Sequence, residues 1–117
     1  MSYLKVRLKE SGVVLAERVE MANSLYKRVL GLMFQKELVG VDGLLIQPCN
    51  SIHTCFMRFS IDVIFLSANG EIIKILRSMK PWRFSWMYLR AVKALELKAG
   101  TVPVSLREGM FLEVQHV

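Results

Sequence analysis

Residues 61–77 read IDVIFLSANGEIIKILR and decide the fold, because they contain two apolar runs joined by a turn signal. The runs, 61–66 and 71–77, flank the dipeptide Asn69-Gly70. Both residues of this dipeptide tolerate positive φ, and Asn-Gly between β-rich runs is the strongest short-range signal for a hairpin. The stretch therefore predicts two antiparallel strands.

Further strands are expected on both sides of this hairpin. Leu4, Val6 and Leu8 alternate with charged residues, which is typical of a strand with one buried face. A turn at residues 10–12 then leads to a second strand, which completes an N-terminal hairpin. This second strand covers residues 13–19. Further short β-rich stretches bring the expected number of strands to about seven; they are 44–46, 91–97 and 110–114.

One short helix is expected among these strands. Asn23-Ser24 is a helix-start signal, and apolar residues recur at helical spacing over residues 24–33. A single helical turn capped by Thr101 is a further possibility. The fold class is thus α+β and β-dominated, with mostly antiparallel strands in a compact sandwich or an open barrel-like sheet.

Length and composition indicate one domain spanning residues 1–117. A chain that is 53% hydrophobic and 22% charged is neither disordered nor of low complexity. Charged residues interrupt every apolar run before the ~18 residues that a membrane span needs. The first ten residues lack the apolar core of an export signal, and two cysteines fit a reducing compartment, so a cytoplasmic location is expected.

Positive charge is concentrated in residues 77–93. The chain carries a net charge of +6, and this segment holds five bases and no acid, together with several aromatic residues. Its simpler interpretation is a solvated loop whose aromatic rings pack on the sheet. Alternatively it contacts nucleic acid or an anionic lipid surface, or mediates self-association or a protein contact through residues 80–90. The predicted contact residues are Lys80, Trp82, Arg83, Trp86 and Arg90.

Residues 49–62 hold the densest group of reactive side chains. Cys49, His53, Cys55 and Met57 are soft or borderline metal ligands, but C-x3-H-x-C is not a common zinc spacing. No metal and no cofactor is therefore expected. Either thiol could serve as a nucleophile with His53 as its base, whereas the simpler interpretation is that both thiols fill the core.

Asp62 raises a separate question, because it interrupts an apolar strand where an unpartnered carboxylate would be costly to bury. Its partner could be Arg58 or main-chain N–H groups of the intervening turn. A structural role is favoured over a catalytic one. Glu96, between Leu95 and Leu97, raises the same question.

Several separated stretches, in order, resemble the family called domain of unknown function 192. The resemblance covers about residues 15–114 and implies a compact β-rich domain found mainly in prokaryotes, with no established activity. It points to residues 53–62 and 95–97 as signature positions, while Cys55 and Met110 depart from the family's usual aromatic and Asp. Members often carry an export signal or lipoprotein anchor. The matching stretches are 30–34, 42–46, 51–66, 94–100 and 108–109.

A binding module is the leading functional hypothesis. A polar pocket between residues 53 and 62 would hold a small anionic or polar ligand or a peptide. The alternative is a hydrolase-like or metal-dependent enzyme that uses the same polar cluster. The predicted ligand-binding residues are His53, Thr54, Met57, Arg58, Asp62 and Glu96.

Overall fold

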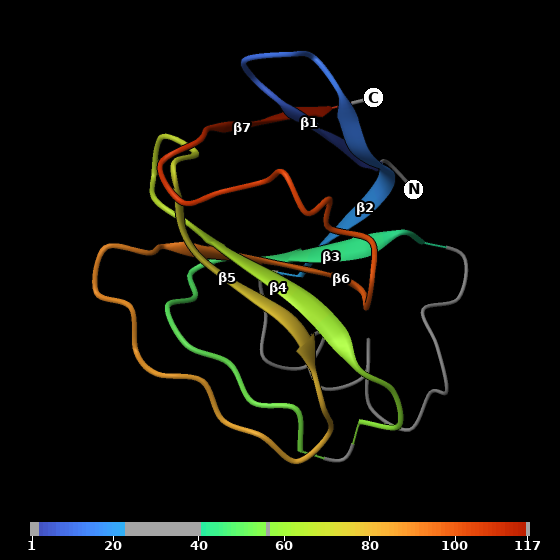
Figure 1. Cartoon of the computed structure of the whole chain (residues 1–117), viewed down its shortest axis with the longest axis vertical. Helices are drawn as coiled ribbons and strands as arrows, with labels where there is room; N and C mark the ends of the chain where they lie inside the picture. Colours follow the sequence, from blue (N-terminus) through green and yellow to red (C-terminus); the bar gives the residue numbers. More distant parts are fainter. Residues whose placement is uncertain (1–2, 23–40, 56, 117) are drawn as a thin grey trace.

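Seven strands form one mixed sheet in the computed structural model, which describes residues 3–22, 41–55 and 57–116. The sheet order is β5-β4-β6-β3-β2-β1-β7, and the sheet curls into an open half-barrel (Figure 1). The strands are β1 (Leu4–Leu8), β2 (Val14–Ala22), β3 (Gly43–Ile46), β4 (Ile61–Leu66), β5 (Ile72–Met79), β6 (Lys93–Lys98) and β7 (Leu112–His116).

All seven predicted strands are present, each end displaced by at most three residues. Both hairpins are confirmed, since β1 pairs with β2 and β4 with β5, each antiparallel. Gly70 has a φ of 88°, and a Cβ there would collide with the carbonyl oxygen of Leu112. The Asn69-Gly70 turn thus needs glycine for its backbone and for its packing against β7. The one parallel pair among the described strands is β2–β3.

The expected helix over residues 24–33 lies outside the described residues, and those that are described contain no helix. After Thr101 the chain makes two separate hydrogen-bonded turns, Leu106 N to Pro103 O at 3.1 Å and Met110 N to Arg107 O at 3.2 Å, in place of a helical turn. The described fold is therefore a curled β-sheet, which matches the barrel-like alternative and not the sandwich. No helix in the described ranges is long and apolar enough to cross a membrane.

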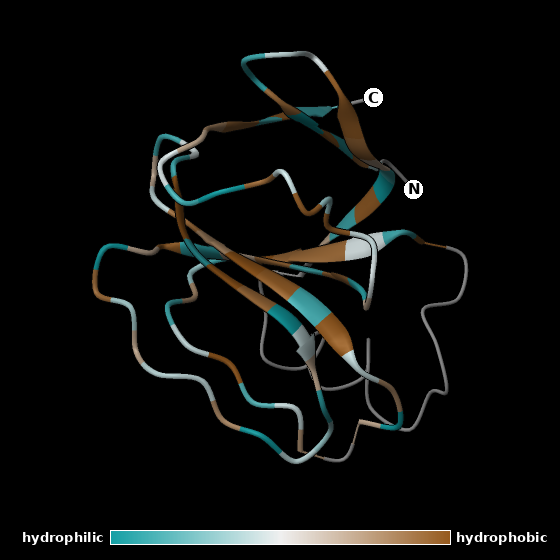
Figure 2. Ribbon diagram, in the orientation of Figure 1, coloured by the Kyte–Doolittle hydropathy of each residue, from teal (hydrophilic) through white to brown (hydrophobic). Residues whose placement is uncertain are grey.

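Two apolar layers lie on opposite faces of the central strands. Alternate residues of a strand point to opposite faces, so a strand covered on both sides is buried along its whole length. β4 shows this pattern at all six positions and is coloured mainly hydrophobic in Figure 2. The inner layer joins Ile64 and Leu66 to β1, β2 and residues 102–112, and the outer layer joins Val63 and Phe65 to residues 49–57 and 79–91.

The far edge of the sheet is more exposed. There β1 pairs with β7 in register, with Arg7 opposite Glu113. The Arg7 guanidinium donates to the Glu113 carboxylate at 2.7 Å and, chiefly through this hydrogen bond, lowers the pKa of Glu113 below its usual value. The pair marks the solvated side of this edge.

Candidate functional site

Asp62 holds two distant segments to the sheet. Its carboxylate is 1% exposed and accepts three main-chain hydrogen bonds, from Ser78 N at 2.8 Å and from Gly100 N and Val102 N at 3.0 Å. Main-chain N–H groups are therefore the partners of this carboxylate, but they come from β5 and from the segment after β6 and not from the turn before Asp62, as was expected. Arg58, the other expected partner, is exposed.

Arg77 completes this attachment. Its guanidinium donates to the carbonyl oxygens of Val102 at 2.9 Å, Pro103 at 3.0 Å and Leu106 at 3.2 Å. Residues 99–111, which we call the closing loop, are thus fixed over the inner layer by a buried anion and a cation. Arg77 belongs to this structural contact, although its sequence neighbourhood placed it with the basic segment.

Thr54 plays the corresponding role for the connection between β5 and β6. This connection, residues 80–92, is called the aromatic loop from here on. Thr54 is 0% exposed; its hydroxyl donates to Lys80 O at 2.6 Å and accepts from Arg83 N at 2.9 Å. Its main chain pairs with the same turn, through Thr54 N to Arg83 O at 2.9 Å and Trp82 N to Thr54 O at 3.0 Å. Thr54 therefore fixes the start of the aromatic loop.

The rest of the aromatic loop follows residues 49–54. Ser85 N donates to Ile52 O at 2.9 Å and Tyr88 N donates to Asn50 O at 2.8 Å. In Figure 1 the loop runs beside the segment that follows β3. Its main chain is consequently held at several points between the two strands that it joins.

Five large apolar side chains of the aromatic loop are nevertheless more than half exposed. The exposed fractions are 57% for Trp82, 76% for Phe84, 82% for Trp86, 63% for Met87 and 81% for Leu89. The expectation that the aromatic rings of this segment pack on the sheet is wrong for Trp82, Phe84 and Trp86. It holds for Tyr88, whose ring lies 4.8 Å from that of Phe65.

Cations accompany this exposed apolar surface. Lys80 and Arg83 are exposed, whereas Arg90 contacts the Glu71 carboxylate at 3.3 Å. A groove of about 350 Å³ separates the loop from the edge strand β5, and none of the described residues that line it is acidic. Lys74 and Arg83 are among those lining residues. The surface is therefore both apolar and positively charged.

The six residues predicted to bind a ligand do not surround one hollow. Register pairs Asp62 with Leu97 and Glu96 with Val63, so these two buried carboxyl groups point to opposite faces of the sheet. The other four are divided between the core and the surface. Thr54 and Met57 are buried, Arg58 is exposed, and His53 is exposed with its ring 6.0 Å from that of Phe84.

Two solved structures share this fold. A crystal structure of a candidate transcription regulator from Sinorhizobium meliloti 1021 aligns with a TM-score of 0.75 at 24% identity, covering 97% of this chain and 92% of that one. A protein of unknown function from Novosphingobium aromaticivorans DSM 12444 aligns with a TM-score of 0.71 at 19% identity, covering 94% of this chain and 82% of that one. At these identities the likeness shows the fold alone.

Two relatives in sequence come from Pyrococcus species. The UPF0127 protein PH1112 of Pyrococcus horikoshii is 39% identical over 95 residues, which cover 79% of this chain and 77% of that protein. The UPF0127 protein PF1050 of Pyrococcus furiosus is 46% identical over 69 residues, 56% of this chain and 59% of its own length. Residues 6–114 match the domain of unknown function 192, DUF192, described as an uncharacterized ACR. The chain belongs to this family.

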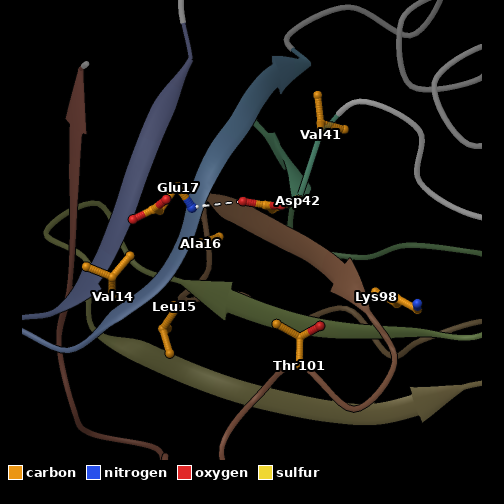
Figure 3. Close-up of a pocket in the computed structure, with 8 residues that line it drawn as sticks. All are labelled: Val14, Leu15, Ala16, Glu17, Val41, Asp42, Lys98 and Thr101. Carbon is orange, nitrogen blue, oxygen red and sulfur yellow. Dashed lines mark hydrogen bonds between the residues drawn. The ribbon is translucent and has the colours of Figure 1, made fainter.

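The Asp42-Gly43 pair is one of the stretches by which the chain resembles DUF192, and it has a structural explanation. Because β3 begins only at Gly43, residues 14–18 of β2 lack a neighbouring strand on that side. Asp42 Oδ2 accepts from Glu17 N and Arg18 N, both at 3.0 Å, and so replaces the missing strand (Figure 3). A Cβ on Gly43 would lie 2.5 Å from Glu96 O, so glycine is needed for the close approach to β6.

A slot of about 510 Å³ lies beside Asp42, between β2 and the end of β6. Figure 3 shows Glu17, Asp42, Lys98 and Thr101 around it. Its polar groups carry both signs of charge, and Asp42 is already engaged with β2. This slot of the DUF192 domain is therefore explained by the short β3.

The thiols of this DUF192 chain occupy separate environments. Cys49 is buried and its Sγ lies 3.1 Å from Ser51 O, while Cys55 is half-buried, and the two do not form a disulfide. His53 Nδ1 accepts from Cys55 N at 3.2 Å, a main-chain contact. Within the ranges that the structure describes, no group of three His, Cys, Asp or Glu side chains is placed to hold a metal ion.

Proposed function

We propose that this DUF192 protein is a binding protein that recognises an anionic partner through the aromatic loop. The observation that carries the proposal is the exposure of five large apolar side chains next to Lys80 and Arg83. Exposed apolar patches rimmed by polar residues mark interaction sites, because such surface is costly to keep in water. The positive charges of Lys80 and Arg83 favour a negatively charged partner.

The rigidity of the loop backbone supports this proposal. Hydrogen bonds to residues 50–54 fix the main chain, so the outward direction of the side chains belongs to the fold. Trp82 also has a φ of 63°, in the left-handed region that bulky residues rarely adopt. Strain of this kind persists where the surrounding structure enforces it, and it concentrates at functional positions.

A small ligand bound by His53, Thr54, Met57, Arg58, Asp62 and Glu96 together has less support. Asp62 and Thr54 already bind main-chain groups, and the set is divided between two faces of the sheet. His53 lies against Phe84 and joins the proposed surface instead. Two cysteines without a disulfide support a cytoplasmic setting for this contact.

Salt-dependent retention on heparin tests the proposal. The variant Lys80→Ala/Arg83→Ala removes two charges from the loop, and Lys98→Ala/Arg107→Ala removes two exposed charges from elsewhere. We expect the loop variant to elute at clearly lower salt than the control variant, since local phosphate or sulfate contacts depend on position and not only on net charge. Equal elution of both variants would overturn the proposal.

A further inference from the structure

We infer that the anionic partner is a lipid bilayer, and that the aromatic loop inserts its apolar side chains at the headgroup region. Lys80 and Arg83 would contact the lipid phosphates. This inference rests on the proposed function and specifies its partner. Its basis is the combination of side chains that the loop exposes.

The non-aromatic residues of the loop favour lipid over nucleic acid. Single-stranded nucleic acid is bound by stacking its bases on planar rings. Met87 and Leu89 are as exposed as the neighbouring rings, at 63% and 81%, yet neither has a ring on which a base could stack. An acyl boundary accepts Trp, Phe, Met and Leu alike, because it requires only apolar surface.

The distribution of charge has the same implication. Trp is enriched at the membrane interface, and Lys and Arg extend their charged ends from that depth toward phosphate and water. In the loop, Lys80 and Arg83 precede the main apolar run and Arg90 follows it. Cations therefore border the apolar residues at both ends. Self-association through the same face would bring these cations together across the interface, which like-charge repulsion opposes.

The chain carries its own optical reporter for this contact. It has two tryptophans, Trp82 and Trp86, and both belong to the aromatic loop. Both are exposed, at 57% and 82%, so the emission of the protein in solution should be that of water-exposed indole. Any change in tryptophan emission on binding thus reports on this loop.

The experiment titrates the protein with large unilamellar vesicles, in low salt, and records tryptophan emission and co-sedimentation. One set contains phosphatidylglycerol and phosphatidylcholine, a second contains phosphatidylcholine alone, and a third carries bromine on the acyl chains of the anionic mixture. We expect a blue shift and co-sedimentation with the anionic vesicles, and quenching by the brominated lipid. Binding to phosphatidylcholine alone should be weaker, by about fivefold for each basic residue in contact.

Met87→Ser/Leu89→Ser is the decisive variant, because it keeps both tryptophans and every cation of the loop. We expect its affinity for anionic vesicles to fall by at least about tenfold while its retention on heparin stays unchanged. Val104→Ser is the matched control, since Val104 is 93% exposed but belongs to the closing loop. It should bind vesicles like the unmodified protein. Should the double variant lose its thermal transition, Leu89→Ser alone replaces it.

The outcomes separate the inference from the proposed function. Heparin retention without vesicle binding overturns the bilayer as partner, and vesicle binding without a blue shift overturns the insertion of the aromatic loop; both results leave an anionic partner in place. Quenching by an oligothymidine single strand, without a blue shift and undiminished in Met87→Ser/Leu89→Ser, assigns the loop to nucleic acid. Elution of Lys80→Ala/Arg83→Ala and Lys98→Ala/Arg107→Ala from heparin at the same salt concentration overturns the proposed function itself.

Discussion

The closing loop and the aromatic loop are attached to the sheet in similar ways but expose opposite surfaces. Each is held by a buried polar side chain that binds main-chain groups: Asp62 for the closing loop and Thr54 for the aromatic loop. The closing loop buries Val102 and Leu106, at 4% and 3% exposure, whereas the aromatic loop leaves Trp86 at 82%. Burial in the first loop is explained by stability. Stability does not explain why the aromatic loop exposes its apolar side chains, and we therefore assign a function to that loop.

The largest expected effect lies on the stabilising side of this comparison. Asp62→Ala removes a buried carboxylate and leaves the N–H groups of Ser78, Gly100 and Val102 without their acceptor. Removing one partner of a buried charged contact costs about 3 to 5 kcal/mol, and we expect a loss in that range. Thermal denaturation should show a melting temperature lower by about 10 °C or more.

Asp62→Asn is the control for this prediction, because it keeps one acceptor oxygen and the shape of the side chain. Its melting temperature should lie between those of Asp62→Ala and the unmodified protein. A melting temperature of Asp62→Ala unchanged from the unmodified protein would show that the closing loop needs no anchor, and would remove one half of the comparison.

The second prediction measures burial directly, with the same truncation in each loop. Leu106→Ala deletes a side chain that is 3% exposed in the closing loop, and Leu89→Ala deletes one that is 81% exposed in the aromatic loop. We expect a loss of about 2 to 4 kcal/mol for the first and within about 0.5 kcal/mol of zero for the second. Urea denaturation measures both. A comparable loss in Leu89→Ala would mean that this side chain stabilises the fold, which contradicts our reason for assigning it to a partner.

The sequence predicts those features of the structure that depend on contacts between residues close together in the chain. Strands depend on alternation and turn chemistry within a few residues, so Leu4–Leu8 and the Asn69-Gly70 hairpin could be located from the sequence. The partners of Asp62 lie 16, 38 and 40 residues away, and those of the Thr54 hydroxyl lie 26 and 29 residues away. A single sequence contains no periodicity that pairs residues at such separations.

The candidate site shows the same limit. The composition of residues 77–93 indicated a basic and aromatic surface. The residue types alone, however, do not show which of the aromatic rings are packed and which are exposed. Only the placement of the main chain against residues 50–54 distinguishes the exposed Trp86 from the half-buried Tyr88. Likewise, Asp62 and Glu96 resemble members of one polar cluster until the strand register assigns them to opposite faces.

The third prediction tests whether Thr54 holds the aromatic loop as Asp62 holds the closing loop. Thr54→Val keeps the shape of the side chain but leaves Lys80 O and Arg83 N without the hydroxyl, at a cost of about 1 to 3 kcal/mol. We expect faster tryptic cleavage after Arg83 under native conditions, with cleavage after Arg107 in the closing loop increasing less.

Thr54→Ser is the control, because it keeps the hydroxyl and should preserve the slow cleavage after Arg83. Equal acceleration at Arg83 and Arg107 in Thr54→Val would indicate global unfolding. In that case Thr54 would be an anchor of the whole domain and not of one loop.

The smallest expected effect concerns Trp82, where the fold and the proposed contact have opposing requirements. Pro81 followed by a residue with a φ of 63° is the combination that a type II turn uses, and glycine normally occupies the second position. A left-handed conformation costs a bulky residue roughly 1 to 2 kcal/mol, and Trp82→Gly removes this cost while adding the chain entropy of glycine. We therefore expect the melting temperature to stay within about 2 °C of the unmodified value or to rise, because the two contributions nearly cancel.

Binding of Trp82→Gly to anionic vesicles should weaken at the same time, since an exposed indole is lost. A variant that is less stable and binds equally well would place Trp82 with the side chains that stabilise the fold, and the aromatic loop would then resemble the closing loop at this position.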